Sequence, residues 1–347
     1  MREQSADMPY RPGTRPARPA PAPTARGRGT DARHFAALDL GTNNCRLLIA
    51  RPQPGGFAVV DAFSRIVRLG EGLALTGRLS DAAIDRTLEA LAICADKLRR
   101  RHVALSRSVA TEACRRASNG SDFIERAYRE TGIALDIISA EEEARLAVLG
   151  CHVLIEAGDD PALIFDIGGG STELVLVDTR TTVPTVLDWH SAPWGVVSLT
   201  ESVNGAGSDA DRAAAYARMR ALVAESFASF AMRLPRDVAT PRLLGTSGTI
   251  TTLASVHLGL ARYDRSAVDG LIVPAEAMRR ISADLAGKSI ADRARVPCIG
   301  NERADLVVAG CAILESIMDL WPAERVGVAD RGIREGILRR LMNGSRP

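Results

Sequence analysis

The feature that most constrains the fold is a series of strand and helix patterns that occurs twice along the chain. An apolar run ending at Asp39 passes through a polar turn at 41–44 into a second apolar run, and a third strand pattern follows at 57–69. Helix and strand patterns then alternate to residue 138, and the series starts again with "ALIFDIGGGSTELVLVD". Two copies of β-β-β-α-β-α-β-α predict an α/β protein with two duplicated domains and a cleft between them.

The two copies also align at their first turns. Asp39-Leu40-Gly41 matches Asp166-Ile167-Gly168, and Arg46 falls opposite Glu173. A single Asp-x-Gly turn is weak evidence, because the aspartate can simply cap the turn through its own backbone. Two such turns in register, each opening a copy of the pattern, favour binding of phosphate.

Phosphoryl chemistry requires many hydrogen-bond donors and a metal, because the transferred group carries spread negative charge. Glycines allow backbone N–H groups to approach an anion closely. Asp39 and Asp166 each end a strand just before such a turn, so across a cleft they are placed to hold Mg²⁺, directly or through water. The residues predicted to bind phosphate at the two turns are Gly41, Thr42, Asn43, Asn44 and Arg46, and Gly168, Gly169, Gly170, Ser171 and Thr172.

A run of three glutamates in "SAEEEARLAVLG" is separated by helical spacing. Ser139 is a predicted N-cap, which puts Glu142 at the third helical position, where it completes a capping box. Glu143 differs from its neighbours, because Leu146, Ala147 and Gly150 lie on its side of the helix. A carboxylate on the apolar side either polarises a water molecule or pairs with a nearby arginine, and spacing leaves both interpretations open.

A third candidate is "LLGTSGTITTLASVHLGL", which reads as strand, tight turn and helix. Backbone amides at the start of that helix suit another phosphate, although a plain strand-to-helix turn has the same pattern. The sequence contains no P-loop, no Gly-x-Ser-x-Gly elbow and no metal-ligand spacing among its five histidines. These absences argue against nucleotide binding through a P-loop and against a serine hydrolase.

Composition excludes several other classes. The net charge of +2 gives no strong field for nucleic acid or membranes, and no apolar run approaches the length of a bilayer span. Six cysteines lie in apolar contexts without a C-x-x-C motif, which indicates reduced core thiols and a cytoplasmic protein. The Pro/Arg-rich stretch 1–33 holds seven arginines against three acidic residues and is predicted to be a disordered tail.

Taken together, the motifs resemble a known family. "DLGTNNCRLLI", "VRLGEGL", "VATEACRRA", "IISAEEEARL", "FDIGGGSTELV", "GTSGTI" and "DRGIREGIL" are similar to those of the exopolyphosphatase/guanosine pentaphosphate phosphohydrolase (Ppx/GppA) family. The paired turns also resemble those of the wider actin/Hsp70/sugar-kinase superfamily. The resemblance implies two actin-like, ribonuclease H-like domains, here expected at 34–155 and 156–347, with no C-terminal HD-like domain.

The resemblance also implies roles for individual residues. Glu143 and Glu173 match the catalytic glutamates, and Asp39, Asp166 and Glu173 match the metal side of the site, expected to hold Mg²⁺ or Mn²⁺. Asn44 stands where the family usually has serine. Further residues that match phosphate-binding positions are Arg68, Arg115, Ser247, Gly248 and Thr249.

The expected activity is release of terminal orthophosphate from inorganic polyphosphate by water, with a homodimer as the expected assembly and neither membrane nor specific nucleic acid as partner. The first alternative is a guanosine pentaphosphate (pppGpp) 5′-phosphohydrolase. The second is an actin-like ATPase or kinase, and the third is a scaffold that senses nucleotide by closing its two domains.

Overall fold

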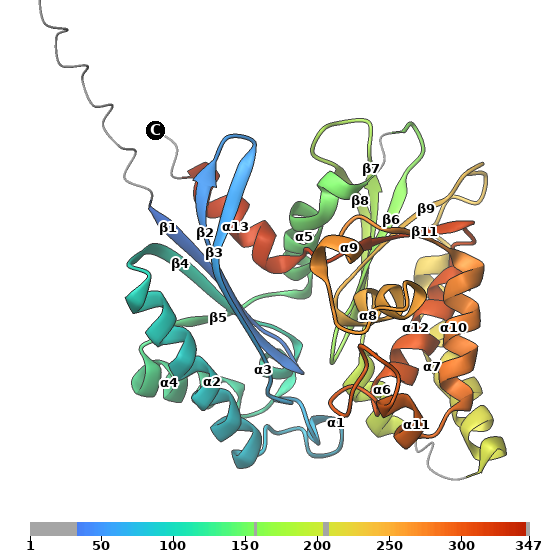
Figure 1. Ribbon diagram of the computed structural model, residues 1–347, viewed down its shortest axis with the longest axis horizontal. Coiled ribbons are helices and arrows are strands. Elements are labelled where there is room, and N and C mark those ends of the chain that lie inside the picture. Colours follow the sequence, from blue (N-terminus) through green and yellow to red (C-terminus); the bar gives the residue numbers. More distant parts are fainter. Residues whose placement is uncertain (1–32, 156–157, 204–207, 345–347) are drawn as a thin grey trace, which may run out of the picture. The chain divides into compact units, whose positions relative to one another are not determined.

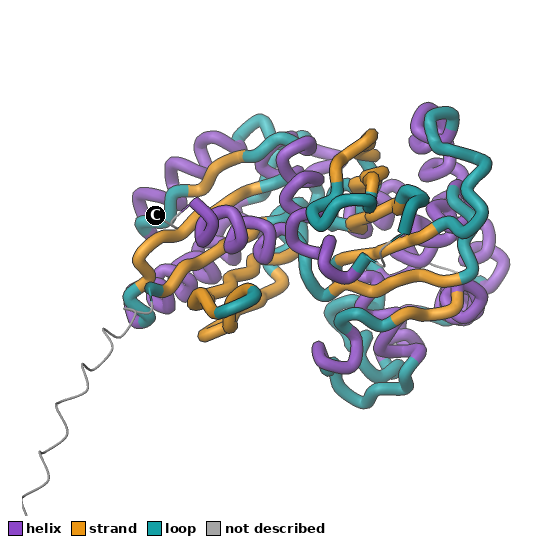
Figure 2. Tube along the Cα trace, turned by 90° about the horizontal axis from the view of Figure 1, so that it is seen from above, coloured by secondary structure: helices purple, strands orange, loops and turns teal. Residues whose placement is uncertain are grey.

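The computed structural model describes residues 33–155, 158–203 and 208–344, and these contain two mixed β-sheets flanked by helices (Figure 1, Figure 2). The predicted tail at 1–33 lies outside the described residues except for Arg33. Within the described ranges, no helix combines the length and apolar character that a bilayer span requires.

The first sheet has the strand order β3-β2-β1-β4-β5, with β2 antiparallel to both neighbours and β1, β4 and β5 parallel. Its elements are β1 (His34–Leu40), β2 (Asn44–Gln53), β3 (Gly56–Ile66), α1 (Leu73–Thr76), α2 (Asp81–Arg100), β4 (Val103–Ala110), α3 (Glu112–Arg116), α4 (Gly120–Thr131), β5 (Leu135–Ile137), α5 (Ala140–Cys151) and the 3₁₀ turn η1 (His152–Leu154). The predicted β-β-β-α-β-α-β-α order of the first copy is therefore confirmed.

The second sheet repeats this arrangement as β8-β7-β6-β9-β11 and adds β10 at its edge. Its elements are β6 (Ala162–Ile167), β7 (Thr172–Asp178), β8 (Thr185–Ala192), α6 (Val196–Ser202), α7 (Asp209–Ala231), β9 (Arg242–Thr246), α8 (Gly248–His257), α9 (Arg265–Val268), β10 (Ile272–Pro274), α10 (Ala275–Gly287), α11 (Ile290–Ala294), α12 (Val307–Leu320), β11 (Arg325–Ala329) and α13 (Ile333–Gly344). The two sheets confirm the expected pair of actin-like folds.

Local signals in the sequence set several helix ends. The Ser80 side chain accepts a hydrogen bond from the Ala83 N–H at the start of α2, and Ser139 does the same for Glu142 at the start of α5. Gly132 ends α4 with φ 74°, a left-handed conformation that glycine adopts without strain.

The last helix, α13, packs against the first sheet and against α5 rather than against the strands that precede it. Ile337 and Leu338 are fully buried among Phe35, Ala37 and Leu48. The end of the chain thus completes the helical layer on one face of the first sheet, and α5 and α13 lie side by side in Figure 1. The division at residues 155 and 156 remains a prediction.

Candidate active site

Two antiparallel hairpins, one from each sheet, place the charged residues of the site. In the first hairpin Asp39 on β1 lies opposite Arg46 on β2. In the second, Asp166 on β6 lies opposite Glu173 on β7. The sequence alignment of the two copies therefore corresponds to equivalent cross-strand pairs, with arginine in one sheet where the other has glutamate.

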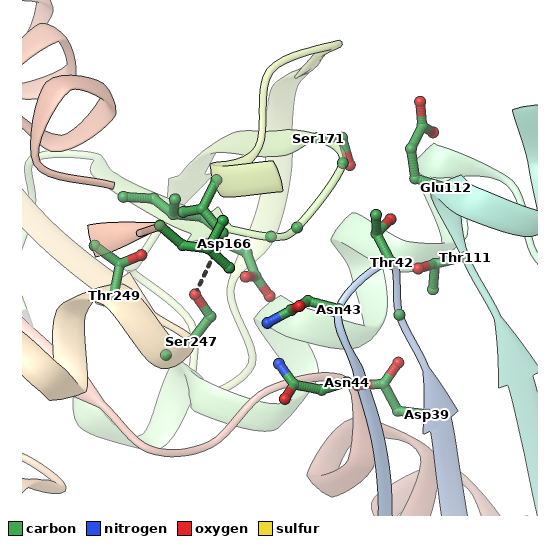
Figure 3. A pocket seen from close by; sticks show the side chains of 18 of the residues that line it. Asp39, Thr42, Asn43, Asn44, Thr111, Glu112, Asp166, Ser171, Ser247 and Thr249 are labelled. Carbon is green, nitrogen blue, oxygen red and sulfur yellow. Dashed lines mark hydrogen bonds between the residues drawn. The ribbon is translucent and has the colours of Figure 1, made fainter. Parts of the chain in front are cut away.

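A cavity of about 120 Å³ lies where the two hairpins meet. Most of the predicted residues line it: Asp39, Gly41, Thr42, Asn43, Asn44, Arg46, Glu143, Asp166, Gly168, Gly169, Gly170, Ser171, Ser247, Gly248 and Thr249. Figure 3 shows the side chains of Asn43 and Asn44 from the first turn close to Ser247 and Asp166 from the second sheet. The cavity is smaller than the several hundred Å³ that enclose a whole drug-sized ligand, so it suits one end of a longer molecule.

The glycines of the second turn allow the two turns to touch. A Cβ atom on Gly169 would lie 2.9 Å from the Thr42 Cβ and 3.0 Å from the Asn43 backbone nitrogen. On Gly170 it would lie 2.6 Å from the Thr42 Oγ1. Any side chain at these two positions would therefore separate the turns, which adds a packing reason to the predicted exposure of backbone N–H groups.

The predicted turn between β9 and α8 forms the third wall. Ser247 has φ 82°, a conformation that costs a non-glycine residue roughly 1–2 kcal/mol. Its hydroxyl donates to the Ile167 carbonyl oxygen at 2.6 Å, which ties this turn to the end of β6. Helix α8 begins at Gly248, so its first N–H groups border the cavity, where they favour negative charge.

Burial changes the protonation of the aspartates. It raises the pKa of Asp166 to about 6, although the positive charge of Arg46 opposes this shift. It also raises the pKa of Asp39, which Arg46 and Arg334 hold down. Arg46 is thus a shared counter-charge for both aspartates.

Burial and neighbouring carboxylates raise the pKa values of the two glutamates. Burial, and then the charge of Asp166, raise the pKa of Glu173 to about 7, while hydrogen bonds from Ser171 (2.7 Å) and Ser191 (3.0 Å) lower it. Burial and the nearby Glu173 raise the pKa of Glu143 well above its ordinary value, and Arg115 opposes them. Glu143 and Glu173 therefore interact, and the negative charge of Glu173 favours the protonated form of Glu143.

Glu143 pairs with an arginine, which is one of the two interpretations that its spacing left open, and its action on a water molecule stays a prediction. It lines the cavity and is only 7% exposed, and it also pairs with Arg115 at 3.2 Å. Arg115 further donates to Glu112 at 2.6 Å and to the Ile138 carbonyl oxygen at 2.7 Å. Its guanidinium is therefore held beside Glu143 and does not line the cavity.

Three other predicted residues also lie off the cavity wall. Arg68, at φ 47°, reaches Asp305 at 3.0 Å and the Glu302 carbonyl oxygen at 3.3 Å. Thr172 is buried, and its hydroxyl donates to the Trp194 carbonyl oxygen. Glu173 stands behind the turn, 2% exposed.

The cavity wall contains residues that the sequence patterns did not indicate. Arg303 lines it and donates to the Thr252 hydroxyl at 2.8 Å, which adds a positive charge to the second-sheet side. Arg303 lies just before α12, a helix buried on almost every side, so no amphipathic period marked this region. The remaining additions are Thr111, Glu112, Ile167, Val196, Thr252, Leu306, Val307 and Ile333.

The donor set fits a magnesium ion held mainly by substrate and water. Asp39, Asp166 and Glu173 supply hard oxygen atoms, and the buried Asn43 Oδ1 has no hydrogen-bond partner. Among the described residues, no three side chains of His, Cys, Asp or Glu are grouped as a ready-made metal site. Mg²⁺ is commonly bound through one or two carboxylates together with substrate phosphates, and these residues suit that mode.

The fold and this cleft define an actin-like protein whose cavity is bordered by two equivalent Asp-x-Gly turns. The Ppx/GppA phosphatase family matches residues 48–344, and the chain belongs to this family. "Exopolyphosphatase 2" of Mycobacterium tuberculosis is 33% identical over 315 residues, which is 87% of this chain and 96% of that protein.

Two further relatives extend this comparison. A "Guanosine-5'-triphosphate,3'-diphosphate pyrophosphatase" of Aeromonas salmonicida is 30% identical over 320 residues; the match covers 90% of this chain and 60% of that longer relative. The crystal structure of the Aquifex aeolicus family member has a TM-score of 0.73 at 27% identity, covering 91% of this chain and 99% of that one.

Proposed function

We propose that this protein is an exopolyphosphatase, a phosphoanhydride hydrolase that releases terminal orthophosphate from inorganic polyphosphate. The observation that carries the proposal is the placement of Glu143, a buried carboxylate of raised pKa, on the wall of a small cavity bordered by three turns. Relatives of similar length bear the name exopolyphosphatase, which agrees with this substrate.

The terminal phosphate is bound mainly by backbone. N–H groups of the two hairpin turns and of the first turn of α8 surround its oxygens, and Arg46 and Arg303 add positive charge. The cavity holds only the end of a chain, so the rest of a polyphosphate extends outward from it. A nucleoside would likewise lie outside the cavity, which provides it with no enclosed pocket.

Glu143 accepts a proton from the attacking water. The water oxygen bonds to the terminal phosphorus, the bridging P–O bond breaks, and the shortened chain leaves with the bond's electron pair. A general base is most effective when its pKa lies near the working pH, and burial moves Glu143 in that direction. Glu173, oriented by Ser171 and Ser191, keeps negative charge close to Glu143 and Asp166.

Mg²⁺, which we propose is held directly by one or two of the carboxylates of Asp39, Asp166 and Glu173 and otherwise by substrate and water, would neutralise charge on the phosphate oxygens. Arg115 fixes the orientation of the Glu143 carboxylate and is therefore a positioning residue.

The test is a panel of polyphosphates of several lengths, pppGpp and ATP, each assayed for phosphate release with Mg²⁺ and with EDTA. We expect polyphosphate to be cleaved fastest and EDTA to abolish release. Faster release from pppGpp would favour the alternative activity, for which relatives such as the Aeromonas enzyme are named. Preference for ATP would reject both.

A pair of variants separates the loss of a site residue from a general effect of removing a buried glutamate. Glu173→Gln is expected to lose most of its turnover, and near-normal release would reject its assignment. Glu315→Gln is the matched control, because Glu315 is also buried (7% exposed) and paired with Arg220, whereas Glu173 accepts a hydrogen bond from Ser171 on the cavity wall.

We further propose that the protein acts in the cytoplasm as a homodimer, as actin-like proteins often pair. Light scattering at the concentration used in the assay tests the assembly. A monomer mass that persists in the presence of polyphosphate would reject it.

A further inference from the structure

A second cavity, of about 660 Å³, lies between the β2–β3 hairpin and the start of α13. It is bordered by the hairpin residues Gln53, Gly55, Gly56, Phe57 and Val59, by Arg265, Ser266 and Asp269 around α9, and by Arg331, Glu335 and Arg339. Its volume falls in the range of pockets that take small organic molecules. None of these residues lines the cleft described above.

Two of its three arginines are already neutralised. Arg265 pairs with Asp330 at 3.2 Å and with the buried Glu335 at 3.0 Å. Arg331 donates to Asp269 at 2.7 Å. The acidic side chains around this cavity are therefore committed to these two cations.

The third arginine, Arg339, differs from the other two. Arg339 has no ion pair or hydrogen bond within the described ranges, and its Nε atom is buried without an acceptor. Burial lowers its pKa and the charge of Arg331 lowers it further, while the negative charge of Glu335, which is already paired with Arg265, opposes them. Arg339 also lines the cavity and is only partly buried, so an anion there would accept hydrogen bonds from the accessible part of its guanidinium and add counter-charge.

The opposite wall is apolar. Phe57 is half-buried and Val59 is 48% exposed, and Gly55 and Gly56 beside them have no side chains. A bare inorganic anion would contact Arg339 and leave this wall and most of the volume unused. The cavity is therefore complementary to a molecule with one anionic end and one apolar end.

We propose that this cavity binds a small organic anion, with its phosphate or carboxylate group against Arg339 and its apolar part against Phe57 and Val59. The site is separate from the phosphate cleft and does not depend on the function proposed for it.

Phenyl phosphate is the probe, titrated calorimetrically in the presence of EDTA. The titrations use an Arg303→Gln background, which weakens phosphate binding in the cleft. A hydrogen bond to a charged group contributes roughly 1.5–3 kcal/mol, so adding Arg339→Gln should weaken phenyl phosphate binding about ten- to hundred-fold. Arg129→Gln, which removes an exposed arginine of α4 outside the cavity, is the matched control and should leave binding unchanged.

Two further arms test the ligand class. Val59→Ser should weaken binding of phenyl phosphate but not of inorganic phosphate, and benzoate in place of phenyl phosphate identifies the preferred anionic group. The proposal is overturned if the Arg303→Gln protein binds neither aromatic anion, or if a folded Arg339→Gln protein binds both as tightly as its parent. Circular dichroism and the unfolding midpoint establish that each variant is folded.

Discussion

Replacing Arg115 with glutamine tests whether a neighbouring charge sets the protonation of Glu143. The two side chains lie 3.2 Å apart and are 22% and 10% exposed. With an effective dielectric constant of about 20, Coulomb's law gives roughly 332/(20 × 3.2), or about 5 kcal/mol, for this pair. Water entering the site and the competing Glu112 reduce this energy.

The direction of the pKa change at Glu143 follows from the positive charge of Arg115. Arg115 favours the ionised form of Glu143, so its loss raises the pKa of Glu143 further and lowers the fraction able to accept a proton. We expect the acidic limb of the kcat/KM profile for polyphosphate to move to higher pH by about one unit or more in Arg115→Gln. Turnover should recover at alkaline pH, which a merely misfolded variant would not show.

Arg116→Gln is the matched control. Arg116 is the next residue on α3, is 43% exposed, and lies 3.8 Å from Glu112 without contacting Glu143. It should leave the acidic limb in place. An acidic limb that is the same in both variants would show that Glu143 does not act as the base whose ionisation limits the reaction.

Three other predictions concern the turns and Glu173. Ser247→Gly and Ser247→Ala both lose the hydroxyl, but only glycine relieves φ 82°, so the glycine variant should be more stable to urea by about 1 kcal/mol or more; equal stabilities would contradict strain at this position. Gly169→Ala should lower the free energy of unfolding by about 1–3 kcal/mol and reduce turnover, because its Cβ meets Thr42, whereas Gly287→Ala, with nothing within 4 Å, should do neither. Burial and Asp166 raise the pKa of Glu173 from 4.5 to about 7, so its charged form destabilises the fold. In EDTA, Glu173→Gln should therefore have the same free energy of unfolding as the wild type below pH 4.5 and one about 3 kcal/mol higher above pH 7. A difference in the free energy of unfolding that does not change with pH would refute this.

The duplicated hairpins were predictable because their register depends on local features. The apolar runs, the Asp-x-Gly turns and the alignment of Arg46 with Glu173 are all contained in short stretches, and the strand pairing confirms them. Ser80 and Ser139 were equally predictable as N-caps, because the side chain of each accepts a hydrogen bond from a backbone N–H group in the first turn of its own helix.

Contacts between segments far apart in the sequence could not be predicted from local patterns. Arg68 matched a phosphate-binding position, yet it reaches Asp305 instead, a partner 237 residues away. Arg303 entered the cavity wall without any signal, because it lies in the turns before α12, where neither a motif nor a helical or strand period marks it. The exclusion of side chains at Gly169 by Thr42 likewise depends on the approach of two sheets, which no local pattern records.

The equivalence of Arg46 and Glu173 explains how a duplicated scaffold produces two different halves of one site. In the first hairpin the cross-strand pair Asp39–Arg46 combines opposite charges. In the second, Asp166–Glu173 combines two carboxylates, of which Glu173 is buried and Asp166 is partly buried on the cavity wall. Burial without a local cation raises the pKa values of this second pair, and Arg46 reaches across to offset part of the effect on Asp166. One difference between equivalent strand positions therefore supplies a cation, Arg46, which we propose holds phosphate, on one side of the site and carboxylic acids of raised pKa beside Glu143 on the other.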